Sequence, residues 1–271
     1  MENFILCGGL PRTGSTLLMS ILQENPNIFT TSTCPIPHIV FNIVTKSRSD
    51  NTFMAMDSIV ADRALFGLIH KGTEGWFNSL TQKPIVISKN RIWNEVRYLY
   101  PKSKFICMIR DPRDIFDSFM RVEETFKSLK TFNVYDKKIV SSMSYDEIYE
   151  FYFGKNALID NPIQNIKYLI EQNDDTLFVK YEDLTEDPIS TLKRIYEFIN
   201  VDYYNHNLED IKSSLVYEHD SVYYNERVLH KVHSKLIKSE PKKKFLPDCY
   251  YDSIMSKYDW FYKQFYATEV Q

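Results

Sequence analysis

The stretch GGLPRTGSTLL, residues 8–18, combines two glycines with an arginine and several hydroxyl side chains. It nearly matches the phosphate-binding loop of nucleoside triphosphatases, which reads Gly, four residues, then Gly-Lys-[Ser/Thr]. Gly9 and Gly14 have this spacing and Thr16 fits the last position, but Ser15 stands where the pattern has lysine. The stretch therefore predicts a loop that binds a phosphate-like anion and departs from the usual ATP-binding form.

The residues on either side of this loop predict a strand before it and a helix after it. FILCGGL (4–10) reads as a buried strand, and STLLMSILQEN begins a helical pattern. Backbone N–H groups at a helix N-terminus favour an anion, and Arg12 adds a fixed positive charge. The alternative is an ordinary turn capped by Thr13 or Ser15. The order of strand, arginine, glycine, hydroxyls and helix favours the anion site.

The missing lysine bears on which anion this loop holds. In nucleoside triphosphatases that lysine contacts the terminal phosphates, and the following hydroxyl binds magnesium. Ser15 replaces the lysine here, and no obvious acidic magnesium site follows a strand. A ligand with a shorter anionic chain and no required metal fits better than ATP, although a P-loop kinase stays open as an alternative.

Three further apolar runs read as buried strands: PIVISK (84–89), KFICMIR (104–110) and TLFVKY (176–181). Because helical patterns alternate with them, we expect an α/β fold, a P-loop-type parallel sheet flanked by helices on both faces. Ligands of such folds bind at the carboxyl ends of the strands. We expect one domain over 1–271, with a helical, aromatic-rich insertion at about 123–175 that covers the core or lines a substrate cleft.

The composition excludes several classes of protein. A net charge of −3 over 271 residues argues against a nucleic-acid-binding protein, which would normally be basic. The four cysteines have no paired spacing, which favours a reducing compartment, and we expect a soluble cytoplasmic protein. No apolar run approaches the ~20 residues of a membrane span. No cluster of potential metal ligands is complete, so no metal is expected.

Three segments together resemble one family. GLPRTGSTLL resembles the 5′-phosphosulfate loop of sulfotransferases, and FICMIRDPRDIFDSFM resembles their 3′-phosphate signature, with Arg110 eight residues before Ser118. LFVKYEDLTEDPISTLKRIYEFINV is similar to the family's Tyr-Glu-Asp-Leu strand and helix. These segments run from residue 4 to about 201. The resemblance is closer to the bacterial and protein-tyrosine sulfotransferase-like branch than to the cytosolic phenol type.

The resemblance implies a donor, 3′-phosphoadenosine 5′-phosphosulfate (PAPS), and a product, 3′-phosphoadenosine 5′-phosphate (PAP). Arg110 and Ser118 would bind the 3′-phosphate, and Tyr181 matches a position that often contacts adenine in relatives. A half-buried aromatic at a strand end is the alternative for Tyr181. Glu182 and Asp183 are expected to cap the next turn rather than to take part in chemistry. The phosphosulfate would lie on the loop residues Pro11, Arg12, Thr13, Gly14, Ser15, Thr16 and Leu17.

Two cations are candidates to act on the transferred group. Arg12 would hold it and stabilise the leaving phosphate. Lys89 ends the strand PIVISK and matches a strand-end lysine that relatives place near the sulfuryl group. A solvated strand terminus is the alternative for Lys89.

The general base is not specified by the sequence. TTSTCPIPHIV (30–40), where protein-tyrosine sulfotransferases have a glutamate, contains no carboxylate, and His38 is the nearest proton acceptor. A structural or substrate-contacting histidine is the alternative. His230 and Lys231 lie in RVLHKVHSKLIKSEPKKKF (227–245), which resembles a segment near the donor in bacterial relatives. Lys231 would bind the donor and His230 would serve as base, with a basic surface loop as the alternative.

The function expected from these patterns is transfer of a sulfuryl group from PAPS to a hydroxyl or amine of an unidentified acceptor. A P-loop kinase and a non-catalytic sulfotransferase-like nucleotide-binding protein are the alternatives. The last aromatic stretch, YYDSIMSKYDWFYKQFY (250–266), reads as an amphipathic helix that packs on the core. The acceptor and the oligomeric state do not follow from the sequence.

Overall fold

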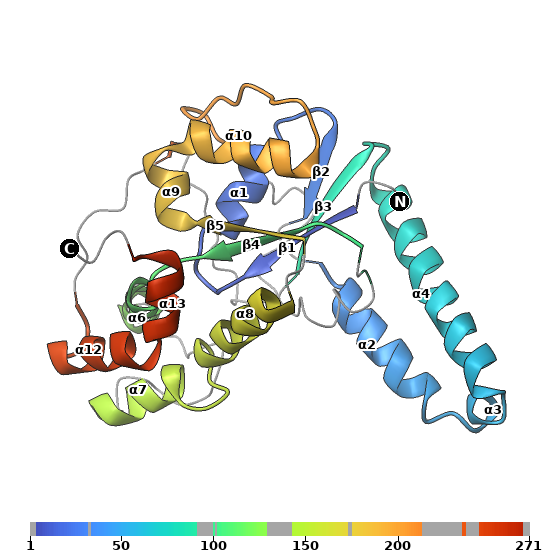
Figure 1. Cartoon of the computed structure of the whole chain (residues 1–271), viewed down its shortest axis with the longest axis horizontal. Coiled ribbons are helices and arrows are strands. Elements are labelled where there is room, and N and C mark those ends of the chain that lie inside the picture. The colour runs from blue at the N-terminus through green and yellow to red at the C-terminus, as the bar shows by residue number, and fades with distance from the viewer. Residues whose placement is uncertain are drawn as a thin grey trace.

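The computed structural model describes residues 4–31, 34–90, 100, 102–128, 143–172, 175–212, 235–236 and 244–267. Its centre is a five-stranded sheet with the order β2-β3-β1-β4-β5, and every neighbouring pair is parallel (Figure 1). The predicted α/β architecture is therefore confirmed. The strands are β1 (Phe4–Gly9), β2 (Ile28–Thr31), β3 (Ile85–Lys89), β4 (Phe105–Ile109) and β5 (Thr176–Lys180).

Four of these strands agree with the predicted ones to within one residue at each end. The fifth, β2, was missed, although all four of its residues are buried. Its sequence is IFTT, which is shorter than an average strand and half hydroxyl-bearing, so no apolar run marks it. β2 pairs with β3 and forms one edge of the sheet. β3 lies between β2 and β1.

The helices that follow the strands include those the sequence predicts. They are α1 (Ser15–Leu22), α6 (Pro112–Ser128), α9 (Tyr181–Glu186) and α10 (Pro188–Ile199). Pro188 occupies the first turn of α10, where its missing N–H costs no hydrogen bond. α10 buries one apolar face, which consists of Leu192, Ile195, Tyr196 and Ile199.

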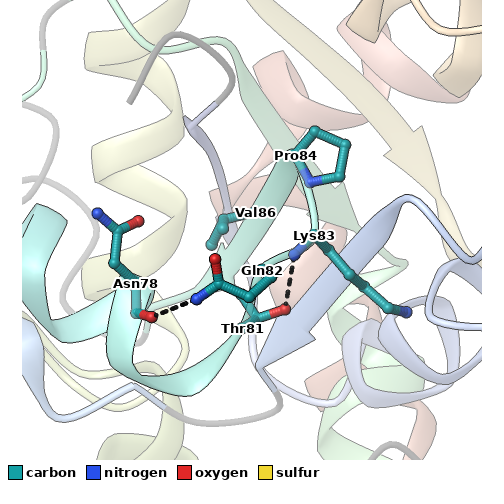
Figure 2. Close-up of a pocket in the computed structure, with 6 residues that line it drawn as sticks. All are labelled: Asn78, Thr81, Gln82, Lys83, Pro84 and Val86. Atoms are coloured by element: carbon teal, nitrogen blue, oxygen red, sulfur yellow. Dashed lines mark hydrogen bonds between the residues drawn. The ribbon is translucent and has the colours of Figure 1, made fainter.

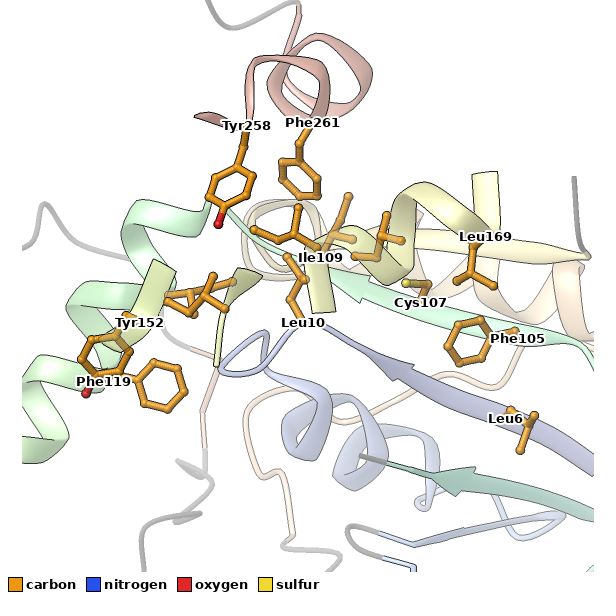
Figure 3. Close-up of a cluster of buried hydrophobic side chains, with 14 of the residues drawn as sticks. Leu6, Leu10, Phe105, Cys107, Ile109, Phe119, Tyr152, Leu169, Tyr258 and Phe261 are labelled. Carbon is orange, nitrogen blue, oxygen red and sulfur yellow. The ribbon is translucent and has the colours of Figure 1, made fainter. Parts of the chain in front are cut away.

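Alternating strand residues build two cores, one on each face of the sheet. Phe4 and Leu6 face one core, and Ile5 and Cys7 face the other, as the two-residue period of a strand requires. Figure 3 shows part of the first core, in which Ile109 lies below Tyr258 and Phe261 of the C-terminal segment and Leu6 lies farther along the sheet, toward Phe105. In Figure 1, α1 and α10 cover the opposite face. Because both faces are covered, only the strand ends are left for ligands.

The remaining helices include an arm that the sequence did not predict. It consists of α2 (Ile36–Ser47), α3 (Asn51–Met54) and α4 (Ser58–Leu80), and it extends away from the sheet in Figure 1. α7 (Tyr145–Phe153) and α8 (Asp160–Gln172) lie within the predicted helical stretch at 123–175. The expected last helix is two helices, α12 (Asp248–Lys257) and α13 (Asp259–Phe265). Among the described residues, no helix is long and apolar enough to cross a membrane.

Candidate functional site

The loop after β1 folds through three residues with left-handed backbone. Gly9, Arg12 and Gly14 have φ of 115°, 58° and 72°. A Cβ on Gly9 would lie 2.2 Å from the carbonyl oxygen of Met108 in the neighbouring strand, so only glycine fits there. The loop therefore keeps close contact with β4 and turns directly into α1.

The first turn of α1 has no side-chain cap, so the alternative of an ordinary capped turn is not what the structure shows. Gly14 is the N-cap residue and offers no side-chain acceptor. The Thr13 hydroxyl donates instead to the carbonyl oxygen of Leu10 at 2.9 Å, which braces the loop from within. Backbone N–H groups at the start of α1 therefore point toward the position where an anion would lie.

Arg12 joins the loop to the start of α6. Its Nε donates to Ser118 Oγ at 3.1 Å, and its carbonyl oxygen accepts from Nη1 of Arg110 at 2.9 Å. The two regions predicted to bind the two ends of the donor therefore lie side by side. A left-handed conformation costs a non-glycine residue about 1–2 kcal/mol. Both hydrogen bonds help to hold Arg12 in that conformation.

Arg110 is buried rather than placed on the surface, with 5% of its area exposed. Its Nη2 lies 3.5 Å from Asp114 Oδ2, which is a long ion pair, and its Nε has no hydrogen-bond partner among the residues that the structure describes. A buried guanidinium N–H without a partner is uncommon in native proteins. An anionic group bound beside Ser118, itself 7% exposed, would supply the missing acceptor.

Tyr181 and Lys89 complete the arrangement at the carboxyl ends of the strands. Tyr181 follows β5 directly and is half-buried, and the Arg110 guanidinium lies 4.2 Å from the centre of its ring. Lys89 ends β3, and its Nζ donates to Thr16 Oγ1 at 2.7 Å. The structure thus brings together predicted site residues from four separate segments of the chain.

A family model described as "Sulfotransferase domain" matches residues 2–250 of this chain. The chain belongs to the sulfotransferase family. Sulfuryl transfer is therefore its activity, and the kinase alternative is not favoured. A candidate protein-tyrosine sulfotransferase of Caenorhabditis briggsae is 27% identical over 209 residues, which cover 74% of this chain and 67% of that protein.

Solved structures share the fold at low identity. The sulfotransferase domain from the curacin biosynthetic pathway matches with a TM-score of 0.52 and 15% identity, covering 95% of this chain and 97% of that one. Retinol dehydratase, solved with retinol and PAP, matches with a TM-score of 0.52 and 13% identity, covering 96% and 81%. Mouse sulfotransferase SULT7A1, solved with PAP, matches with a TM-score of 0.50 and 14% identity, covering 100% and 86%.

The candidates for the base of this sulfotransferase stay predictions. His38 lies in the first turn of α2 with an exposed side chain. His230 and Lys231 lie outside the residues that the structure describes.

Sequence patterns gave no signal for a group of half-buried carboxylates and buried tyrosines next to the site. Glu182, expected to cap a turn, instead accepts hydrogen bonds from the Asp111 backbone N–H at 3.3 Å and from the Tyr266 hydroxyl at 3.2 Å. The following helix, α10, is capped by Asp187, which accepts from the Ser190 N–H. Burial raises the pKa of Glu182, although its hydrogen bonds and Arg110 act in the opposite direction.

A cavity of about 220 Å³ lies between the end of α4 and the start of β3, and Figure 2 shows the residues that line it. Lys83, one of its lining residues, donates from Nζ to the carbonyl oxygens of Asn25 and Ile28, which ties the start of β3 to the turn before β2. This cavity lies where β3 begins, whereas the loop and Lys89 lie where the strands end. Its lining residues are Asn78, Thr81, Gln82, Lys83, Pro84 and Val86.

Proposed function

We propose that this sulfotransferase takes its sulfuryl group from PAPS and transfers it to a hydroxyl or amine of an acceptor. The observation that carries the proposal is the pairing of Arg12 with Ser118 and of Arg110 with the Arg12 carbonyl oxygen. PAPS has one anionic group on each side of its ribose. Two neighbouring anion-binding regions with basic side chains match that requirement.

The residues around Arg110 fit the nucleotide end of this donor. The Nε of Arg110, which has no partner in the described part of the chain, and the hydroxyl of Ser118 are donors for the 3′-phosphate. Tyr181 offers an aromatic ring for the adenine next to that phosphate. The phosphosulfate would lie on the loop and the start of α1, at residues 11–17.

When bound, the donor supplies a sulfuryl group on a phosphate leaving group. The Arg12 guanidinium and the Lys89 ammonium stabilise the negative charge that develops on that phosphate. The hydrogen bond from Lys89 to Thr16 holds this ammonium at the first turn of α1. Catalysis then rests on positioning and electrostatic stabilisation, and no metal is part of the proposal.

Three residues are proposed for the acceptor side of the site. His38, His230 or Lys231 would approach the acceptor or the phosphosulfate, with either histidine as base. The similarity to a candidate protein-tyrosine sulfotransferase makes a tyrosine-containing peptide the first acceptor to test. We also propose one sulfotransferase domain over 1–271, in which the helical stretch at about 123–175 lines the acceptor side.

The cellular location is part of the same proposal. None of the four cysteines, all of which lie in described segments, is joined in a disulfide, and Cys7 is buried with its pKa raised to about 12. Burial, which disfavours the thiolate, causes this shift. Such a thiol is structural and inert, and we propose a cytoplasmic location from the cysteine usage.

The test is a thermal titration of the purified protein with PAP and, separately, with ATP and magnesium. A ligand at 100 times its Kd adds about 2.7 kcal/mol to the free energy of unfolding, so the midpoint rises. We expect a rise with PAP that Ser118→Ala reduces. Arg48→Ala is the control, because Arg48 pairs with Asp62 on the exposed arm.

A rise with ATP and magnesium but none with PAP would overturn the proposed donor. PAP binding together with sulfation of a tyrosine peptide from PAPS would support both halves of the proposal. PAP binding without transfer to any of a panel of hydroxyl and amine acceptors would favour a nucleotide-binding protein instead.

A further inference from the structure

The two residues that form the floor of the proposed nucleotide site are each followed by a carboxylate. Asp111 comes directly after Arg110, and Glu182 comes directly after Tyr181. Both carboxylates are held by tyrosines, which are rigid side chains with one polar atom at the end. The hydrogen bonds from these tyrosines therefore restrain the backbone at Asp111 and at Glu182.

Each tyrosine comes from the C-terminal end of the chain. Tyr262, on α13, donates to Asp111 Oδ1 at 2.8 Å, and Tyr266, the residue after α13, donates to Glu182 Oε2 at 3.2 Å. The partners are 151 and 84 residues apart in the sequence. α13 lies beyond residue 250, where the match to the family model ends.

The two halves of this group are also bonded to one another. The Asp111 backbone N–H donates to Glu182 Oε1 at 3.3 Å. Arg113 braces Asp111 further, because its Nε lies 3.0 and 3.1 Å from the two carboxylate oxygens. A network in which each member has partners is rigid, and movement of one member strains the others.

The burial of the tyrosines makes these bonds consequential. Tyr262 is 6% exposed and Tyr266 is 4% exposed. Burial raises the pKa of both phenols, so both are neutral donors over the ordinary pH range. Asp111 and Glu182 are half-buried, and a half-buried carboxylate that loses such a donor keeps part of its desolvation penalty without compensation.

The network acts directly beneath the Arg110–Tyr181 stack. Asp111 and Glu182 are covalently joined to Arg110 and Tyr181 through one planar peptide bond each, so a shift of either carboxylate residue tends to move its neighbour. The stack places the guanidinium 4.2 Å from the ring centre. A displacement of either partner changes where Arg110 presents its free N–H to an anion.

We propose that α13 is a positioning element for the donor site: Tyr262 and Tyr266 fix Asp111 and Glu182, and thereby fix the Arg110–Tyr181 stack that receives the 3′-phosphate end of the nucleotide. The inference rests on the proposed function. Neither tyrosine is a catalytic residue in this proposal, since each acts through a carboxylate and its neighbour.

The test compares Tyr262→Phe and Tyr266→Phe with Tyr258→Phe as the matched control. Tyr258 is also a buried tyrosine at the start of α13, and its hydroxyl donates to Asp160 Oδ1 at 2.9 Å. All three variants remove one hydroxyl that is bonded to a carboxylate. Calorimetry gives the Kd for PAP and for adenosine 5′-phosphate, which lacks the 3′-phosphate, and thermal unfolding gives the stability.

We expect each of the two network variants to weaken PAP binding by roughly tenfold, the scale of one hydrogen bond to a charged group. The Kd for adenosine 5′-phosphate should change less, because that ligand shares the adenine contact with Tyr181 but has no 3′-phosphate to contact Arg110. With PAPS as substrate, the KM should rise while kcat at saturating donor stays close to that of the wild type. The control variant should lose stability but keep its preference for PAP.

Three results would contradict the inference. One is an unchanged Kd for PAP in both network variants. Another is an equal loss for PAP and adenosine 5′-phosphate, which indicates a general structural effect. The third is the same loss of preference for PAP in Tyr258→Phe.

If a tyrosine variant does not unfold cooperatively, Asp111→Asn replaces it. This substitution keeps the shape of the side chain but removes the negative charge that Tyr262 and Arg113 both contact. Wild-type protein that does not bind PAP would overturn the proposed function and this inference together.

Discussion

Gly14 is the position where the structure makes its sharpest quantitative prediction. Gly14 has φ of 72°, and a Cβ there would lie 2.6 Å from Cδ2 and 2.8 Å from Cε2 of Tyr181. Ordinary contacts start at 3.4 Å, so Gly14→Ala must displace the Tyr181 ring. That ring is stacked on Arg110, and the substitution therefore disturbs the proposed nucleotide site without touching any charged group.

The magnitude has a backbone part and a steric part. A left-handed conformation destabilises the folded state by about 1–2 kcal/mol for alanine relative to glycine. Alanine also lowers the conformational entropy of the unfolded chain, which offsets about 0.4–1 kcal/mol of this loss. Loss of the Arg110–Tyr181 stack adds about 0.5–2 kcal/mol. We expect Gly14→Ala to lower the free energy of unfolding by roughly 1–3 kcal/mol and to weaken PAP binding.

A double-mutant cycle with Tyr181→Ala separates the two parts. When the Tyr181 ring is absent, Gly14→Ala should cost only the backbone part, because nothing stands in the way of the new methyl group. The free energy of unfolding, measured with urea for the four proteins, gives the coupling. Gly67→Ala is the control: nothing lies within 4 Å of its Cβ position in α4, and it should stabilise the protein by about 1 kcal/mol.

The prediction is contradicted if the changes in the free energy of unfolding for Gly14→Ala and Tyr181→Ala add up to within about 0.5 kcal/mol, which is the spread expected of independent sites. Additivity would mean that the ring is not constrained by Gly14. A stabilised Gly14→Ala variant would show that the loop does not keep its left-handed turn.

Three further predictions concern charges and backbone strain. The free energy of unfolding, measured with urea, should be higher for Arg12→Gly than for Arg12→Ala by roughly 0.5–1 kcal/mol, because only glycine relieves the left-handed strain. Both variants should lose turnover. Equal stability of the two variants would contradict the strain. Lys89→Met should lower kcat by about 10²- to 10³-fold while PAP still binds; kcat near the wild-type value would remove Lys89 from the mechanism. Burial lowers the pKa of His206 below 6.5, against the opposing effect of Glu24, so the unfolded state binds the proton more readily. The wild type should therefore lose stability relative to His206→Gln as the pH falls from about 7.5 through 6.5, and a constant difference would refute this.

The sequence predicted the parts of the fold that local patterns determine. β1, β3 and β4 are apolar runs buried on both faces, which is the strongest signal a strand can give. β5 is a mostly apolar run at the edge of the sheet, where only Val179 is fully buried. The arm was not predicted, because α4 has glycines at three positions that face open space and much of its apolar surface is exposed. Such a helix lacks the simple apolar stripe by which helices are recognised.

The residues of the candidate site also fall into two groups: those that a local pattern indicates and those that depend on long-range packing. Arg110 and Ser118 were proposed because their spacing, within one strand and the helix after it, resembles the 3′-phosphate signature of the family. The contacts of Tyr262 and Tyr266 depend on how the end of the chain packs against residues far away in the sequence, and no local pattern encodes that choice. Glu182 was misread for the same reason: a carboxylate after a strand is usually a cap, and only the packed tyrosine shows otherwise.

Arg12 shows why the loop has an arginine at a position that would suit glycine. Its left-handed backbone turns the carbonyl oxygen toward Arg110, and its side chain reaches Ser118. A glycine would adopt this conformation without strain, but it would leave Ser118 without its partner and the loop without its cation. Strain that persists at a residue with such contacts points to function rather than to stability. The conformation of Arg12 is therefore an independent argument, beside the motif, that this loop is built to hold an anion.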